Sequence, residues 1–355
     1  MRALILSWRD LKHPRGGGSE VFTQNVAKYG AAAGHEVTFF CAAAPGLAAN
    51  EEVDGYRIVR RGSRLSVYRE ARRYFRESGE GVFDIVLDVV NTRPFMAPQW
   101  AGSTPVVALI HQTAEEVWSY ETAWPLSWVG RYVLEPNWLK VYRSTPVLTV
   151  SQSSRVSLER FGLADITVIP EGVDPPIPRP LPRKETTPTA VFVGRLSANK
   201  RPIDAIQAIS IVRQSLPEAR LWVVGDGPLR SKLEKVSGSG IDFFGKVDSE
   251  VKQDLMASAH ALVATGVREG WGLTVSEAAH LGTRTVGYDV PGLRDSVPAA
   301  KGVLCVPNPE ALARALCANL PVWMKEGRAD LGSAGVVTWE AVAIMVWREL
   351  AKHLR

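Results

Sequence analysis

Two glutamates separated by seven residues enclose a short glycine-containing run, REGWGLTVSE from residue 268. The two glycines predict a backbone loop, and an apolar helix is expected to begin near Leu273. Free amides at such a helix start would point at a phosphate or a sugar oxygen. Glu269 precedes this helix and Glu277 lies in its second turn, so both carboxylates could accept hydroxyl groups of a sugar or ribose. A capped helix with two surface glutamates is the alternative.

A second charged run, VGRLSANKR from residue 193, follows an expected strand. Open α/β sheets bind ligands where strands end, so this position favours a site. Arg195 could bind a diphosphate with its planar fork and Lys200 could bind it as a point charge. The alternative is two solvated cations on a surface loop.

Two further candidates lie in the first half of the chain. The run RGGGSE at 15–20 follows the first strand and opens the first helix, where its amides could approach an anion. It lacks the GxGxxG pattern of dinucleotide sites, and a flexible loop is the alternative. His111 ends an expected strand at the site edge of the sheet, although a hydrogen-bonded structural histidine is the commoner case and needs the other motifs to be set aside.

The elements that must position these groups alternate between strand and helix, which predicts parallel sheets covered by helices on both faces. The expected strands are 3–8, 36–42, 56–61, 83–90, 105–111, 146–151 and 166–170 in the first half, and 189–196, 219–227, 241–247, 260–266, 284–290 and 301–307 in the second. The first helix is expected over 19–33. Five prolines between 175 and 182 exclude both helix and central strand there.

This pattern predicts two domains. We expect an N-terminal Rossmann-like domain over 1–173, a proline-rich linker over 174–188, a C-terminal Rossmann-like domain over 189–337, and a last helix over 338–355 that could pack back on the first domain.

Composition is that of an ordinary soluble protein, with 46% hydrophobic and 22% charged residues. No run approaches the ~20 apolar residues that span a bilayer. The N-terminus turns polar at once, which is not typical of a signal peptide. The three cysteines, Cys41, Cys305 and Cys317, have no zinc spacing and are interpreted as buried free thiols in a reducing cytoplasm. A net charge of +5 hints only weakly at anionic partners.

Taken in order, these runs resemble the retaining glycosyltransferases of family 4. The matching stretches are GGGSE, the strand that ends in His111, VSQSS (from 150), IPEGVD (from 169), VGRLSANK, VVGDGP (from 223), FFGKV (from 243) and REGWGLTVSE. The resemblance covers nearly the whole chain and implies the GT-B fold, in which two Rossmann-like parallel-sheet domains face each other across a cleft.

The resemblance also implies a role for each matching residue. His111 would lie beside the donor sugar, Glu269 would bind its hydroxyls, and Arg195 with Lys200 would neutralise the leaving diphosphate. The other implied donor-binding residues are Gly17, Gly18, Gly194, Gly225, Lys246, Val247, Gly270, Trp271, Gly272, Leu273, Thr274 and Glu277. No metal and no cofactor is implied beyond the nucleotide-sugar substrate.

The chain departs from the family pattern at three places. Glu171 stands where asparagine is usual, Trp271 stands where phenylalanine is common, and PGLRDSV (from 291) matches the donor loop only loosely. These departures affect which nucleotide-sugar donor the protein would bind.

The acceptor side is less well defined. Seven aromatic residues crowd 114–142: Trp118, Tyr120, Trp124, Trp128, Tyr132, Trp138 and Tyr142. They could stack on sugars or lie at a membrane interface, but packing within the first domain is slightly favoured. Arginines 64, 69, 72, 73 and 76 lie on an expected helix that could touch anionic lipid, although a solvated helix is the commoner case.

The sequence therefore predicts a retaining, metal-independent hexosyltransferase that uses a UDP- or GDP-sugar. Its acceptor would be a glycan, a lipid-linked sugar or a small molecule, with no nucleic acid partner. We expect a cytoplasmic location, with peripheral contact at the inner face of the membrane left open. The alternatives are a sugar-nucleotide epimerase of similar fold and a non-catalytic nucleotide-sugar binder.

Overall fold

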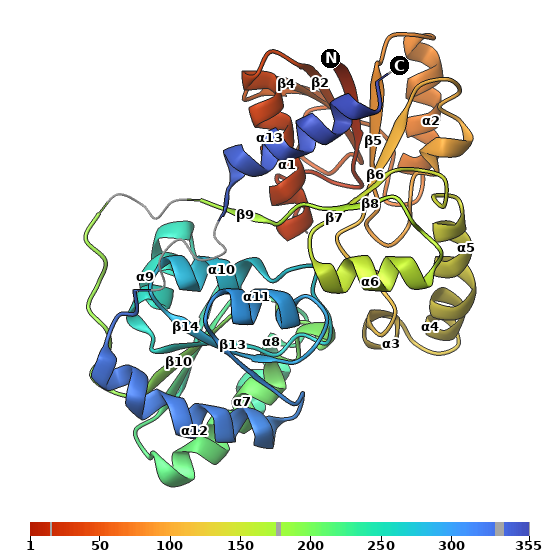
Figure 1. Cartoon of the computed structure of the whole chain (residues 1–355). Coiled ribbons are helices and arrows are strands. Elements are labelled where there is room, and N and C mark those ends of the chain that lie inside the picture. The colour runs from red at the N-terminus through yellow and green to blue at the C-terminus, as the bar shows by residue number, and fades with distance from the viewer. Residues whose placement is uncertain (15, 175–178, 331–336, 355) are drawn as a thin grey trace. The chain divides into compact units, whose positions relative to one another are not determined.

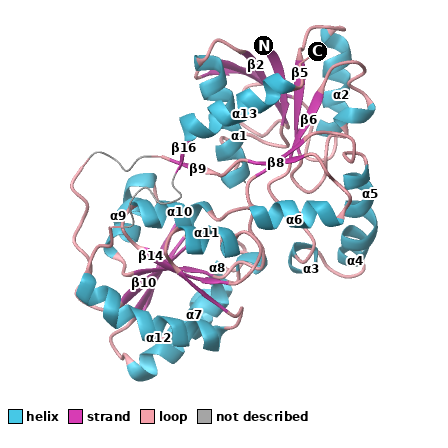
Figure 2. Ribbon diagram, in the orientation of Figure 1, coloured by secondary structure: helices cyan, strands magenta, loops and turns pink. Residues whose placement is uncertain are grey.

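The structure is a computed structural model that describes residues 1–14, 16–174, 179–330 and 337–354. The chain divides into two compact units. Unit 1 comprises 1–115, 124–172 and 337–355, and unit 2 comprises 116–123 and 173–336. Arg15 and the prolines at 175, 176 and 178 lie outside the described residues. Each unit is a sheet of mostly parallel strands with helices on it (Figure 2).

Unit 1 contains an eight-stranded sheet in the order β3-β4-β2-β1-β5-β6-β7-β8. Among its described strands only β3 runs antiparallel to its neighbour, as a hairpin with β4 that the sequence did not predict. The central strands are buried on both faces, which explains their near-continuous apolar runs. The strands are β1 (Arg2–Leu6), β2 (Glu36–Cys41), β3 (Asn50–Val53), β4 (Tyr56–Arg60), β5 (Ile85–Val89), β6 (Val106–Leu109), β7 (Val147–Thr149) and β8 (Ile166–Val168).

The first and last helices of unit 1 begin and end close to the expected places. The described elements are α1 (Gly18–Ala32), α2 (Val67–Ser78), η1 (Ala97–Gln99), α4 (Leu126–Val129), the π-helical turn η2 (Gly130–Leu134), α5 (Glu135–Lys140), α6 (Gln152–Arg160) and α13 (Trp339–Lys352). A separate two-stranded sheet joins β9 (Gly172–Val173) to β16 (Val337–Thr338).

The last helix, α13, lies against the first helix, α1 (Figure 1). The indole Nε1 of Trp347 donates to the Val26 carbonyl oxygen at 2.8 Å. Gly30 allows this approach, since a Cβ built there would lie 2.2 Å from the Trp347 ring. Residues more than 300 positions apart in the chain therefore share one hydrophobic contact in unit 1.

Unit 2 contains a six-stranded parallel sheet in the order β12-β11-β10-β13-β14-β15. The strands are β10 (Thr189–Val193), β11 (Arg220–Val224), β12 (Ile241–Gly245), β13 (Ala261–Ala264), β14 (Arg284–Tyr288) and β15 (Val303–Cys305). Its helical elements are α3 (Val117–Glu121), η3 (Ala198–Lys200), α7 (Pro202–Ser215), α8 (Arg230–Val236), α9 (Ser249–Ser258), α10 (Leu273–His280), α11 (Leu293–Ala299) and α12 (Pro309–Glu326).

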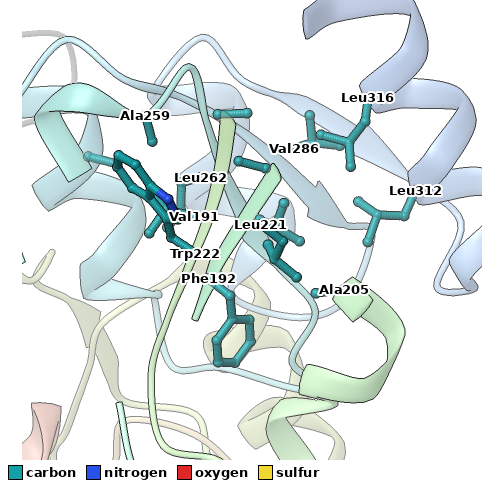
Figure 3. Close-up of a cluster of buried hydrophobic side chains, with 14 of the residues drawn as sticks. Val191, Phe192, Ala205, Leu221, Trp222, Ala259, Leu262, Val286, Leu312 and Leu316 are labelled. Carbon is teal, nitrogen blue, oxygen red and sulfur yellow. The ribbon is translucent and has the colours of Figure 1, made fainter. Parts of the chain in front are cut away.

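The core of unit 2 lies between this sheet and its helices. Figure 3 shows side chains of β10, β11, β13 and β14 gathered with Ala205 of α7 and with Leu312 and Leu316 of α12. Pro202 supplies the first residue of α7, where its missing N–H costs nothing. Such burial on both faces fixes where each strand ends, and hence where the following loop begins.

Two segments belong to unit 2 although the sequence predicts that they lie outside the second domain. Residues 116–123 lie within the expected first domain, yet they group with unit 2. The described part of the linker, 179–188, forms no helix or strand and packs on unit 2. There the Lys184 ammonium donates to the Ala259 carbonyl and the Thr283 hydroxyl. Burial, with Arg328 and Arg284 nearby, lowers the pKa of Lys184 to about 7.

Of the three free cysteines, only Cys41 is fully buried. Cys305 and Cys317 are half-buried, so the expectation of burial was wrong for them. Burial raises the pKa of Cys305 to about 11, which keeps that thiol protonated at neutral pH.

The contact between α1 and α13 predicts that Gly30→Ala destabilises the protein. The added methyl overlaps the Trp347 ring, and overpacking of this kind costs about 1–3 kcal/mol. Thermal unfolding followed by circular dichroism should show a lower midpoint. Gly238→Ala is the matched control, because a Cβ at Gly238 meets no atom within 4 Å. Equal midpoints for the two variants would contradict the close approach of the two helices.

Candidate active site

The order of strands in unit 2 decides which loops meet. β10 lies between β11 and β13, so the connections leave the sheet in opposite directions on either side of β10. Loops after such neighbouring strands separate and leave a crevice at the carboxyl edge of the sheet. The run 194–201 follows β10 and the run 265–272 follows β13. The two strongest charged motifs of the sequence therefore leave the sheet side by side.

Gly225 allows the loops after β10 and β11 to touch. A Cβ on Gly225 would lie 1.9 Å from the Gly194 carbonyl oxygen, and the φ of Gly225 is +133°. Both values exclude a side chain at this position. The predicted donor-binding glycine at 225 thus has a structural purpose, because the absence of a side chain lets it meet the backbone of Gly194.

The ion pair of Lys200 and Glu269 is the central feature of unit 2. The Lys200 Nζ lies 2.5 Å from Glu269 Oε1 and 2.6 Å from Oε2, although 69 residues separate them in the chain. The Thr265 hydroxyl donates to the Lys200 carbonyl at 2.8 Å, and the Val267 N–H donates to the Asn199 carbonyl at 2.9 Å. These bonds hold the two loops together. A cation and an acceptor-only carboxylate are thereby placed within reach of one ligand.

Glu277, the second glutamate of the motif, pairs with a residue that the sequence did not single out. Lys252 of α9 donates to Glu277 Oε1 at 2.8 Å. The second oxygen, Oε2, is buried and has no hydrogen-bond partner within the described chain. A buried carboxylate oxygen without a donor is suited to accept a hydroxyl group.

Helix α10 begins at this motif, as expected. Its N-cap, Gly272, has a φ of +103°, which a side chain would strain. The backbone N–H groups of Gly270, Trp271 and Gly272 make no hydrogen bond within the described ranges. The Trp271 indole N–H donates to the Ser276 hydroxyl at 2.9 Å and so fixes the ring against α10. The start of α10 therefore offers free amides and the positive end of its dipole to an anion.

Helix α3 contacts η3, the turn that carries Lys200. Glu116, just before α3, accepts from the guanidinium of buried Arg268 at 2.9 Å. No pattern in the sequence indicates this pair, because 152 residues separate its members. It anchors 116–123 beside the loop that holds Glu269.

The other predicted donor-binding residues of unit 2 are accessible. Arg195 and Lys246 are exposed, Val247 is half-buried, and Leu273 and Thr274 are half-buried in the first turn of α10. Neither Arg195 nor Lys246 forms a side-chain ion pair with any residue that the structure describes. Both cations remain available to a ligand.

In unit 1 the glycine run forms a helix cap. Gly17 is the N-cap of α1, and its N–H donates to the buried Glu20 carboxylate at 2.7 Å, while Gly18 is the exposed first residue of the helix. Glu20 also accepts from the Asn91 side chain and forms an ion pair with Arg9 at 2.9 Å. The Gly17 amide is therefore already paired with Glu20 in this structure, and the role of Gly17 and Gly18 at a donor diphosphate stays a prediction.

His111 lies just after β6 and is buried. Its Nδ1 is 3.2 Å from Glu171 Oε1, and its carbonyl accepts from the Ser154 hydroxyl at 2.7 Å. Phe22 of α1 packs edge-on against the imidazole. Its Nε2 is buried and has no hydrogen-bond partner in the part of the chain that the structure describes. The structure therefore connects His111 to the carboxylate that the sequence marked only as a departure.

The aromatic segment 114–142 is mostly not a packed core. Trp124 is 81% exposed, and Tyr120, Trp128 and Tyr132 are also exposed. The prediction of packing within the first domain was wrong for these four residues. It holds for Tyr142, which is buried and donates to Asp88. Burial raises the pKa of Asp88 to about 6, while the hydrogen bonds from Tyr142 and two backbone amides oppose this shift.

Helix α2 does not present a free apolar face. Tyr68 and Phe75 pack against the core of unit 1. Arg73 pairs with Glu77 at 2.7 Å. The arginines of this helix are exposed, and whether they touch anionic lipid stays a prediction.

The described residues contain no group of three or more His, Cys, Asp or Glu side chains that could hold a metal ion. Within the same ranges, no helix is both long and apolar enough to cross a membrane.

Two family models match this chain. The model described as Glycosyltransferase Family 4 matches residues 16–176, and the model described as Glycosyl transferases group 1 matches residues 187–320. Together they cover the glycine run, His111 and the glutamate motif. The chain belongs to glycosyltransferase family 4.

Relatives and solved structures agree with this family 4 assignment. A GDP-mannose-dependent alpha-(1-6)-phosphatidylinositol dimannoside mannosyltransferase of Mycobacterium tuberculosis is 32% identical over 181 residues, which is 48% of each chain. A glycogen synthase of the same species is 30% identical over 233 residues, 62% of this chain and 55% of the relative. The family 4 chain thus spans about half the length of the relatives that it matches.

The sucrose-phosphate synthase of Thermosynechococcus elongatus superposes with a TM-score of 0.78 at 19% identity, over 99% of this chain and 98% of that one. This likeness confirms the predicted GT-B fold, with parallel sheets in two Rossmann-like domains.

The two glycines at 225 and 17 give a test of the site geometry. Gly225→Ala should destabilise unit 2 by at least about 2 kcal/mol, because the new Cβ meets the Gly194 carbonyl and the positive φ adds strain. Gly17→Ala should stay within about 0.5 kcal/mol, since a Cβ there meets only Glu20 at an ordinary 3.6 Å. Urea unfolding of both variants measures the difference. A tolerant Gly225 would show that the loops after β10 and β11 do not touch.

Proposed function

We propose that this family 4 chain transfers a hexosyl unit from a nucleoside diphosphate sugar to an acceptor hydroxyl, with retention of the anomeric configuration and without a metal ion. The observation that carries the proposal is the ion pair of Lys200 and Glu269 at the point where strand order reverses in unit 2.

This pair supplies the two groups that the reaction needs. A departing nucleoside diphosphate gains negative charge, which Lys200, Arg195 and the free amides before α10 can stabilise. A hexose presents hydroxyl donors, which the Glu269 carboxylate can accept. In the structure Lys200 and Glu269 neutralise each other, so each must exchange its partner for one part of the same ligand. The donor then binds with its phosphates on the cation and its sugar on the carboxylate.

The proposed step breaks the bond between the anomeric carbon and the phosphate oxygen, and the acceptor oxygen bonds to that carbon on the same face. The acceptor proton passes to an oxygen of the departing diphosphate. Positive charge develops on the ring, so the half-buried Glu269 carboxylate also stabilises the oxocarbenium-like state. Lys200 and Arg195 take the place that a metal would otherwise fill on the phosphates.

Of the two bases that the sequence leaves open, guanine is the stronger proposal. The mycobacterial relative is named as GDP-mannose-dependent. GDP-mannose is therefore the first donor to test, and UDP-glucose is the second.

Lys200→Met should weaken GDP binding about 10- to 100-fold, because a charge-assisted contact to the diphosphate is lost. Glu269→Gln should leave GDP binding within a few-fold but lower kcat about 10²- to 10³-fold, because stabilisation of the transition state is lost. Calorimetric titration with GDP and UDP, together with donor turnover, measures both effects.

Lys235→Met in α8 is the matched control for the lysine variant, because its side chain is exposed and distant in sequence from the motifs. Unchanged rates and affinities in both Lys200→Met and Glu269→Gln would remove the assignment. Turnover that needs an added acceptor excludes an epimerase, and slow donor hydrolysis without acceptor excludes a passive binder.

We further propose that the acceptor is lipid-linked and that the chain meets it at a membrane surface. The observation is an exposed aromatic face on 124–134 of unit 1, where Trp124 and Leu126 are 81% and 66% exposed. The face consists of Trp124, Leu126, Trp128, Tyr132, Val133 and Leu134. Apolar groups so placed favour an interface with lipid, where tryptophan and tyrosine are enriched.

The charge around the aromatic face fits an anionic lipid. Arg131, Lys140 and Arg143 lie in or beside it. The single acid between 124 and 143, Glu135, is buried and accepts the backbone amides of Ala114 and Glu115. The exposed side is therefore cationic and aromatic, as a peripheral membrane surface is. The mycobacterial relative is named for transfer to a phosphatidylinositol dimannoside, which agrees with this proposal.

The double variant Trp124→Ser, Trp128→Ser should lose at least about tenfold in binding to phosphatidylglycerol vesicles, since two interfacial anchors are removed. Vesicle co-sedimentation measures binding, with phosphatidylcholine vesicles as the uncharged comparison. Leu65→Ser is the control, because Leu65 is equally exposed but lies beside α2. Replacing Arg69, Arg72 and Arg76 with glutamine tests whether α2 is the membrane-binding surface instead. Loss of binding in that variant alone would overturn the role of the aromatic face.

A further inference from the structure

Three hydrogen-bond donors that lack an acceptor gather at one edge of the unit 1 sheet. Trp8 follows β1, Arg64 follows β4 and Arg93 follows β5. These strands run parallel in one sheet, with β2 between β4 and β1, so the loops after them leave at the same carboxyl edge. The proposed transfer has not used any of these three side chains.

Aromatic rings hold the two arginines in place. The guanidinium carbon of Arg64 lies 5.7 Å from the centre of the Trp8 ring, and that of Arg93 lies 4.3 Å from the centre of the Tyr68 ring. Such contacts attract a guanidinium to the face of a ring and leave its N–H groups free. Trp8 and Tyr68 pack against the same core cluster, so both rings have one rigid support.

The Tyr68 hydroxyl shows that the two arginines act at one place. Burial raises the pKa of Tyr68 to about 12, and the charges of Arg93 and Arg64 both oppose this shift. Two like charges that act on the same group repel each other, and an anion between them would relieve the repulsion.

The neighbouring acid does not supply that anion. Arg9, whose guanidinium also lies over the Trp8 ring, forms an ion pair with Glu20 at 2.9 Å. Arg64 and Arg93 have no hydrogen bond and no ion pair among the residues that the structure describes. Both cations are therefore available to a ligand.

The Trp8 indole adds a third donor. Its Nε1 is buried and has no hydrogen-bond partner within the described ranges. Indole and guanidinium groups can only donate hydrogen bonds. An unpaired buried donor is unfavourable, so this place favours a ligand with several acceptor oxygens. A phosphate group has such oxygens, together with the negative charge and the geometry that guanidinium groups match.

The loops that carry the arginines are fixed by their own hydrogen bonds. The Ser63 N–H donates to the Ser66 hydroxyl at 2.8 Å, just before α2. In the other loop the Arg93 N–H donates to the Asn91 carbonyl at 3.0 Å, and Thr92 has a φ of +68°. Non-glycine residues in this region of φ concentrate at functional sites. Binding of an anion therefore needs to order only side chains.

We propose that Arg64, Arg93 and the Trp8 indole bind one phosphate group of the acceptor. The inference rests on the proposed function for the statement that the ligand is the acceptor, whereas binding of phosphate concerns unit 1 alone. It names the chemical class of the acceptor: a phosphate ester, carried on a lipid headgroup or on a soluble sugar. An uncharged glycan would leave all three donors unpaired.

Phosphate binding is measured on the full chain by calorimetric titration with glucose 6-phosphate, with glucose as the uncharged comparison. Arg64→Gln and Arg93→Gln should each weaken binding at least about tenfold, because a charge-assisted contact is lost. Arg72→Gln is the matched control, since Arg72 is an exposed arginine on α2, and it should bind as the natural chain does. Unchanged affinity when Arg64 and Arg93 are both replaced would overturn the proposal.

The indole is tested by proton–nitrogen correlation spectra of the chain labelled with ¹⁵N-tryptophan. Trp8→Phe identifies the Trp8 signal among those of the eleven tryptophans. Saturation with glucose 6-phosphate should move the Nε1–H signal of Trp8 downfield, as a new hydrogen bond does. Trp8→Phe should also weaken glucose 6-phosphate binding about 3- to 10-fold, since one N–H is lost while a ring remains. A Trp8 signal that stays in place would contradict the assignment of the indole to the site.

Phosphate bound by the donor site of unit 2 would give a different pattern. Lys200→Met should keep its affinity for glucose 6-phosphate when the ligand lies at the unit 1 arginines. Loss of binding in Lys200→Met, with full binding in Arg64→Gln, would place the phosphate in unit 2 and overturn the proposal.

Vesicles that contain phosphatidylinositol distinguish the two sources of the phosphate. Weaker co-sedimentation of the double variant Arg64→Gln, Arg93→Gln supports a lipid headgroup. Unchanged co-sedimentation, together with weaker glucose 6-phosphate binding, supports a soluble phosphate ester. Failure of the proposed function looks different from both: no sugar is transferred from any nucleotide sugar, while glucose 6-phosphate still binds through the arginines.

Discussion

The ion pair of Lys200 and Glu269 depends on a constraint of parallel sheets, which bring the ends of successive strands to one edge. Its two loops are joined by further hydrogen bonds, one from the Thr265 hydroxyl and one from the Val267 N–H, each to a backbone carbonyl. The pair is only half-buried, so it contributes little to the stability of unit 2. Its importance lies in position. It sets a positive and a negative group side by side where a ligand with phosphate at one end and hydroxyls at the other can separate them.

The same arrangement recurs around the motif in weaker form. Glu277 forms an ion pair with Lys252, and Arg268 forms one with Glu116. Each of these charges close to the site therefore has a partner from a distant part of the chain. Exposed Arg195 lacks such a partner among the described residues. A site of this kind is nearly neutral before it binds. Charges that already have a partner cost less to keep in a half-buried place than an isolated charge would.

Unit 1 differs in what it offers. Its glycine run is occupied by Glu20, and its histidine is held by Glu171. Glu20 and Glu171 each pair with a hydrogen-bonding group, the Gly17 N–H and the His111 Nδ1, that would otherwise be free. The exposed aromatic and cationic groups of 124–143 lie instead on its surface.

The sequence by itself determined the fold class, the alternation of parallel strands with helices, and the family. Apolar runs of five to eight residues between helical periods require parallel, doubly covered strands, and ordered motifs such as VGRLSANK and REGWGLTVSE are specific. It also determined that α10 begins at Leu273, since only a local backbone rule is needed there.

Contacts between distant residues were decided by the tertiary structure alone. The partners of Glu269, Glu277, His111 and Arg268 lie 25 to 152 positions away. The sequence also gave no sign that 116–123 group with unit 2 or that Trp124 is exposed. Periodicity records which face of an element is apolar, but it does not record which other element covers that face. Which charges pair depends on which elements pack together, and only the folded chain determines that packing.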